Sequence, residues 1–92
     1  MNQPLTEEEK VVAFKKLFHD NYTTLVTIAR RVLPKEDILV IDDIVQRTMR
    51  DAYMNLDMLL SHPDPEKWLL RTERDKIVEY TEKVQKEKKH RR

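Results

Sequence analysis

Residues 6–34, TEEEKVVAFKKLFHDNYTTLVTIARRVLP, have the pattern of one long amphipathic helix, and this pattern decides the fold class. Thr6 and Glu9 form a Thr-x-x-Glu capping box, which is a start signal for helices. Apolar residues then recur at steps of three, four or seven, which places them on one side of a helix: Val11, Phe14, Phe18, Leu25, Ile28 and Val32. Pro34 disfavours the helical conformation in the residue before it, so we predict a helix over about residues 7–33.

A second helical pattern follows after Pro34. Its start lies between Glu36 and Asp43, because the run ILVI at residues 38–41 fits either a first helical turn or an extended, buried connector. From residue 41 onward the apolar positions repeat with helical spacing. The sequence SHPDP at residues 61–65 ends this second helix.

The third helix has a well-defined start. Asp64 is a good N-cap residue, Pro65 suits the first helical position, and Glu66 is favourable at the positive end of the helix dipole. Three long helices with short connections predict an all-α fold, an antiparallel bundle of three main helices. We expect this helical domain to cover residues 7–92, after a disordered tail at residues 1–6.

The predicted core draws on all three helices. We expect it to contain Phe18, Leu25, Val45, Met49, Ala52, Leu69 and Ile77. The third helix has an anomaly: residues 71–76, RTERDK, are all polar, although a core-facing helix should have an apolar residue near position 73 or 74. We therefore expect the middle of this helix to pack thinly or to meet a partner.

The composition excludes several classes of protein. The 92 residues include no glycine and no cysteine, so glycine-rich phosphate loops, disulfides and thiolate metal sites are excluded. No apolar run reaches the roughly 18 residues that span a membrane, and the N-terminus does not resemble a signal peptide, so we expect a cytoplasmic protein without a membrane partner. The net charge of residues 82–92 is +4, which fits either contact with a polyanion or a solvated helix end.

The sequence offers little for catalysis or for metal binding. His19, His62 and His90 are too far apart to share a helix face as metal ligands. Asp42 and Asp43 are adjacent, so a helix directs their side chains about 100° apart, and no nucleophile lies beside a base. We expect no catalytic residues, no metal, no cofactor and no enzymatic activity.

Two segments carry a resemblance to a known family. The first is DDIVQRTMRDAY at residues 42–53, and the second is EKWLLRTERD at residues 66–75. Together they resemble region 2 of bacterial RNA polymerase sigma factors of the extracytoplasmic-function type. The positions that match the family pattern are Asp42, Asp43, Val45, Gln46, Thr48 and Ala52, and then Trp68, Leu69, Arg71 and Arg74.

The resemblance implies a transcription initiation factor domain with two binding surfaces. The second helix of the family docks on the clamp helices of the largest subunit of RNA polymerase, which here implies Asp43, Gln46 and Arg47, bordered by Met49 and Arg50. The third helix and the loop before it bind the non-template strand of the −10 promoter element. The residues implied for this promoter DNA contact are Ser61, His62, Trp68, Arg71, Arg74, Lys76 and Lys83. An anti-sigma factor is a further partner that the family implies.

Several positions depart from the family pattern. Arg47 replaces a glutamate, Thr72 and Glu73 replace an Ile-Ala pair, and Asp75 replaces an asparagine. The resemblance also ends where region 2 ends, as expected of an excised domain or of a reduced relative. Two alternatives to promoter binding remain: a sigma-like interaction module that binds a protein partner but not DNA, and an unrelated helical scaffold.

Overall fold

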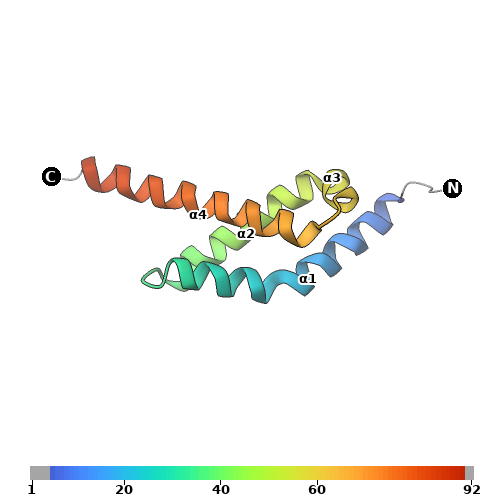
Figure 1. The fold of residues 1–92 in the computed structure, drawn as a ribbon, viewed down its shortest axis with the longest axis horizontal. Coiled ribbons are helices and arrows are strands. Elements are labelled where there is room, and N and C mark those ends of the chain that lie inside the picture. Colours follow the sequence, from blue (N-terminus) through green and yellow to red (C-terminus); the bar gives the residue numbers. More distant parts are fainter. Residues whose placement is uncertain (1–4, 91–92) are drawn as a thin grey trace.

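The computed structural model describes residues 5–90, with side chains through residue 88, and these residues form an elongated all-α bundle measuring 62 × 22 × 20 Å (Figure 1). The helices are α1 (Glu7–Val32), α2 (Ile38–Met54), α3 (Leu56–Ser61) and α4 (Pro65–His90). The three long helices run antiparallel in chain order, and the short α3 joins α2 to α4. The predicted fold class is confirmed.

Side-chain caps explain where the helices begin. The Thr6 hydroxyl accepts a hydrogen bond from the Glu9 backbone, and the Glu9 carboxylate accepts one from the Thr6 backbone, which completes the predicted capping box. Residues 1–4 of the predicted disordered tail lie outside the described residues. The Asp37 carboxylate caps α2 by accepting from the backbone of Leu39 and Val40, so the run at residues 38–41 is a first helical turn.

The second predicted helix is divided in two at Asn55. The Asn55 side chain donates to the carbonyl of Asp51, and its backbone has φ −116° and ψ 31°, which interrupts the helix between α2 and α3. Asparagine side chains compete in this way with regular helical hydrogen bonds. The α4 helix then begins as expected, because the Asp64 carboxylate accepts a hydrogen bond from the backbone of Lys67.

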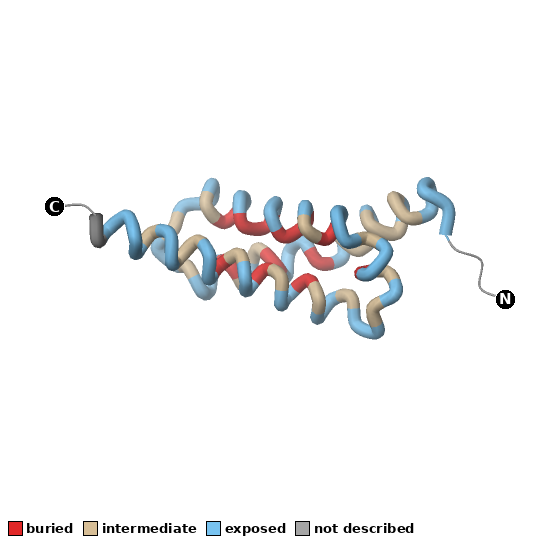
Figure 2. Tube along the Cα trace, turned by 90° about the horizontal axis from the view of Figure 1, so that it is seen from above, coloured by how far each residue is buried: buried red, intermediate tan, exposed pale blue. Residues whose placement is uncertain are grey.

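The core consists of two apolar clusters along the bundle axis. The first cluster contains Leu25, Val45, Met49, Ala52, Leu59 and Leu69, and the second contains Ala29, Ile41, Ile44 and Ile77. Six of the seven predicted core residues are buried in these clusters, and Phe18 is half-buried against the first. Figure 2 shows the buried positions as inward-facing stretches of the long helices.

Glu73 occupies a buried position on the inner face of α4. It lies four residues after Leu69 and four before Ile77, so all three residues lie on the same buried face of the helix. Its side chain is 0% exposed. We expected the middle of the third helix to pack thinly or to meet a partner. Instead, a fully buried carboxyl group occupies the core-facing position there.

Candidate protein-docking and nucleic-acid surfaces

The outward face of α2 contains four of the five residues implied for polymerase docking. Asp43, Gln46, Arg47 and Arg50 are all exposed. They point outward because the opposite face of α2 is buried against α1 and α4. The buried residues of that face are Ile41, Ile44, Val45, Thr48, Met49 and Ala52. This arrangement produces one continuous polar surface along the middle of the helix, over residues 42–50.

Met49 does not belong to this surface. It is only 3% exposed and lies in the first core cluster. This agrees with the prediction that Met49 is a core residue. The expectation that Met49 borders the docking surface is therefore wrong. A methionine at this point of α2 packs against the core because it follows Val45 by four residues on the buried side of the helix.

Asp43 and Arg47 form an ion pair on the outward face of α2. Arg47 Nε donates to Asp43 Oδ2 at 2.8 Å, and both side chains are more than half exposed. Such exposed pairs at a spacing of four stabilise a helix by only about 0.3–0.5 kcal/mol. The pair matters more for recognition, because the Arg47 guanidinium neutralises one of the carboxylates that a partner would meet.

The four cations that the family resemblance implies for DNA contact are divided between two sides of α4. Arg71 and Arg74 are exposed on one side, whereas Lys76 and Lys83 line a groove against α2. The two-residue step from Arg74 to Lys76 rotates the side-chain direction by about 200°. These four cations therefore do not lie together on one side of α4, and of the four, Arg71 and Arg74 are exposed away from the groove.

Lys76 connects α4 to α2. Its Nζ lies 2.7 Å from Asp51 Oδ2 and 3.8 Å from Glu79 Oε1, and its side chain is only 16% exposed. The hydrogen bond with Asp51 raises the pKa of Lys76 above its usual range. An ammonium group held in this way is poorly placed to contact a phosphate, so Lys76 acts in helix packing.

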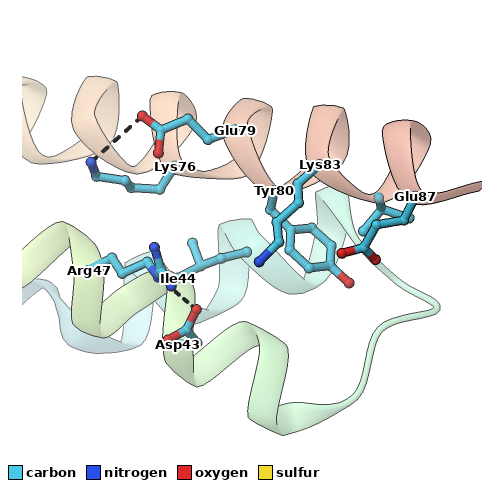
Figure 3. Close-up of a pocket in the computed structure, with 9 residues that line it drawn as sticks. Asp43, Ile44, Arg47, Lys76, Glu79, Tyr80, Lys83 and Glu87 are labelled. Atoms are coloured by element: carbon cyan, nitrogen blue, oxygen red, sulfur yellow. Dashed lines mark hydrogen bonds and ion pairs between the residues drawn. The ribbon is translucent and has the colours of Figure 1, made fainter. Parts of the chain in front are cut away.

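A groove of about 370 Å³ separates α2 from the C-terminal half of α4. Figure 3 shows Arg47 and Asp43 on one wall and Lys83 and Glu87 on the other, with the Tyr80 ring between the two helices. Charges of both signs line this groove. It therefore lacks the uniformly positive character that binding of a nucleic-acid backbone requires.

Ser61 is the last residue of α3, and His62 follows it in the loop before α4; side-chain hydrogen bonds involve both residues. The Ser61 hydroxyl lies 3.0 Å from the Asp57 carbonyl and 3.1 Å from that of Met58, and His62 Nδ1 accepts a hydrogen bond from the Asp64 backbone at 3.0 Å. Ser61 is exposed and His62 is half-buried. These contacts leave a well-formed loop beside the first turn of α4.

Trp68 is a packing residue in this structure. It is partly buried, and it packs against the first core cluster rather than projecting into solvent. An indole in this position anchors the start of α4 to the core. Its ring is therefore a poor platform for an unstacked base.

Glu73 is the most unusual titratable group in the described residues. Both of its carboxylate oxygens are buried without a hydrogen-bond partner, and burial alone raises the pKa of Glu73 to about 7. Sequence reasoning identified the polar run around it but not its burial. The signal was present, because the four-residue spacing from Leu69 to Glu73 to Ile77 places all three on one face.

In the part of the chain that the structure describes, no group of three or more His, Asp or Glu side chains is arranged to hold a metal ion. No helix there is long and apolar enough to cross a membrane. No family model, no curated protein and no solved structure matches this chain.

Proposed function

We propose that this chain is a transcription initiation factor domain of the sigma region 2 type, which docks on bacterial RNA polymerase through the outward face of α2. The observation that supports docking is the exposure of Asp43, Gln46, Arg47 and Arg50 on one uninterrupted helix face. A helix with such a face suits the clamp helices of the largest polymerase subunit, because helices pack through ridges and grooves along their length.

Binding of the full chain to the isolated clamp helices tests this proposal directly. The wild-type chain and variants on the outward face of α2 are compared by calorimetry, with helical content measured in parallel. Saturable binding that these variants weaken supports docking. Absence of binding to both the clamp helices and the core polymerase contradicts it.

Binding of the non-template strand of the −10 element is the second part of the proposed function. It rests on the exposed guanidinium groups of Arg71 and Arg74, on Ser61 at the end of α3 and on His62 in the loop that follows. Cations contact the phosphates of a melted strand, and polar side chains contact its bases. Trp68 packs against the first core cluster and so anchors the start of α4.

The alternative function is a sigma-like interaction module that binds protein but does not bind promoter DNA. Two features favour it: Lys76 is engaged by Asp51, and exposed acidic residues share α4 with the cations, namely Glu66, Asp75, Glu79 and Glu82. Clamp binding without strand binding at low salt would establish this alternative. An anti-sigma factor would then compete for the same α2 face.

A further inference from the structure

The exposed side of α2 contains a line of five residues in which the two ends are apolar and the positions between them are polar. Leu39, Asp43, Gln46, Arg50 and Met54 follow one another at steps of four, three, four and four, and every one of them is exposed. Steps of three and four keep residues close to one line along a helix. We call these five residues the outer α2 stripe.

The two ends of the outer α2 stripe are apolar and unusually exposed. Leu39 and Met54 are each 75% exposed, although both belong to a helix whose other side is fully buried. Fifteen residues separate them, which corresponds to about 22 Å along the helix axis. Each end has a further exposed apolar side chain beside it, Ile38 next to Leu39 and Tyr53 next to Met54, and contiguous exposed apolar patches are typical of surfaces that meet a partner.

The charges within the stripe are arranged so that the stripe complements itself. Asp43 lies four residues after Leu39, and Arg50 lies four residues before Met54, with Gln46 near the middle. In an antiparallel pair of such helices, Leu39 of each copy meets Met54 of the other, and Asp43 of each copy meets Arg50 of the other. A parallel pair instead places like charges opposite one another.

We propose that two copies of this chain associate through the outer α2 stripe, as an antiparallel helix pair with a twofold axis near Gln46. A twofold interface repeats each contact twice, so one Asp43–Arg50 match gives two ion pairs in the dimer. The exposed charges around the stripe, Asp42, Asp43, Arg47 and Arg50, sum to zero. A second copy fits this balance better than a strongly charged partner does.

The ion pair within each copy is compatible with this arrangement. Arg47 Nε engages Asp43 Oδ2, and the carboxylate has a second oxygen for Arg50 of the other copy. One helix face from each copy makes a small interface, so we expect a weak dimer with a Kd on the order of 100 μM. This proposal does not depend on the proposed function, although pairing would cover the face that is proposed to dock on the polymerase.

Sedimentation equilibrium of the full chain, over roughly 10 μM to 1 mM, tests the pairing of charges. Asp43→Arg and Arg50→Asp should each weaken the dimer about tenfold or more, because each change places like charges together twice. The double variant Asp43→Arg with Arg50→Asp should recover association, since it only exchanges the two charges. A monomer at every concentration, or a double variant as weak as the single ones, would overturn the proposal.

The apolar ends of the stripe have a matched control. Leu39→Asp should prevent association, whereas Val12→Asp should not, because Val12 is also largely exposed, at 67%, but belongs to α1. Circular dichroism verifies that each variant retains its helical content. Equal effects of the two substitutions would show that association does not involve the outer α2 stripe.

Disulfide trapping determines the direction of the pair, because the chain has no cysteine of its own. Gln46→Cys should form a disulfide-linked dimer readily, since a residue beside a twofold axis meets its own copy within disulfide distance. Thr24→Cys, at an exposed position on α1, is the control. A mixture of Leu39→Cys and Met54→Cys should give the mixed disulfide, and a preference for the two homodimers would overturn the antiparallel arrangement.

Discussion

Lys76 Nζ lies 2.7 Å from Asp51 Oδ2, and this ion pair joins α4 to α2 beside the core. The Lys76 side chain is 16% exposed and that of Asp51 is 39% exposed, so solvent screens the pair only in part. The contact explains why Lys76, which the family resemblance implies for DNA contact, instead belongs to the packing of two helices.

A double-mutant cycle measures the strength of this ion pair. We expect Lys76→Ala and Asp51→Ala to be coupled by about 1 kcal/mol in the free energy of unfolding, after allowance for the exposure of Asp51. Because the pKa of Lys76 is raised above 10.5, the contribution of the pair is complete below pH 10.5 and is lost as the pH rises through the raised pKa. Additive effects of the two substitutions would show that the contact contributes nothing.

Leu25 tests the assignment of the core. It is 0% exposed and belongs to the first cluster, so Leu25→Ala should lower the free energy of unfolding by roughly 2–5 kcal/mol. Val12→Ala is the control, because Val12 is 67% exposed and its truncation should change stability by about 0.5 kcal/mol or less. Urea unfolding of both variants gives the comparison, and a similar loss in the two would contradict the described packing.

Glu73 should make stability depend on pH in an unusual direction. Its pKa is about 7 in the folded chain and 4.5 when exposed, so the folded state binds more protons between these values. The contribution of Glu73 to stability is therefore greatest below pH 4.5, falls as the pH rises from 4.5 through about 7, and is constant above that range. The expected loss is about 3 kcal/mol.

Glu73→Gln isolates this effect from the other carboxyl groups. A glutamine at position 73 does not ionise, so it removes this pH-dependent loss. The free energy of unfolding of the variant should therefore rise relative to that of the wild type between pH 4 and pH 8. Glu82→Gln, at an exposed position of the same helix, is the control and should have the pH dependence of the wild type. Urea unfolding at several pH values measures all three, and a constant difference between wild type and Glu73→Gln would mean that the pKa of Glu73 is the same in the folded and the unfolded chain.

The sequence was sufficient for features that depend on neighbours along one helix. The Thr6 capping box, the Asp64 cap and the buried position of Leu25 follow from local spacing, and the structure confirms them. The break at Asn55 was missed because apolar periodicity continues across it, although the Asn55 backbone, with φ −116° and ψ 31°, departs from the helical conformation.

Features that depend on how two helices are rotated against each other were less predictable. The contact between Asp51 and Lys76 requires the register of α2 against α4, which no single-helix pattern contains. The separation of Arg74 from Lys76 is different, because a two-residue step on a helix already implies opposite directions. The outward face of α2 was predictable for Asp43 and Gln46 because their neighbours Ile44 and Val45 are strongly apolar.

Docking on the polymerase clamp predicts a defined response to changes on the outward face of α2. Asp43→Ala and Gln46→Ala should weaken binding to the clamp helices without unfolding the chain, since both side chains are exposed. Arg47→Glu restores the residue that the sigma family has at this position, so binding should be retained or strengthened. Calorimetric titration measures the affinity, and unchanged affinity in all three variants would exclude this face as the interface.

Strand binding is the last prediction, and the division of the α4 cations makes it specific. Arg71 and Arg74 are exposed, whereas Lys76 is held by Asp51. Each phosphate contact contributes about 0.7 to the log–log salt slope for a single strand, so Arg71→Ala with Arg74→Ala should lower that slope by about 1.4 for every sequence. Lys76→Ala should leave the slope unchanged.

Substitution of Ser61 or His62 should instead alter preference among bases, because base contacts specify the sequence and phosphate contacts position the strand. Fluorescence anisotropy with labelled single strands at several salt concentrations measures these effects. If the chain binds the clamp helices but no strand even at low salt, it is an interaction module rather than a promoter-binding domain.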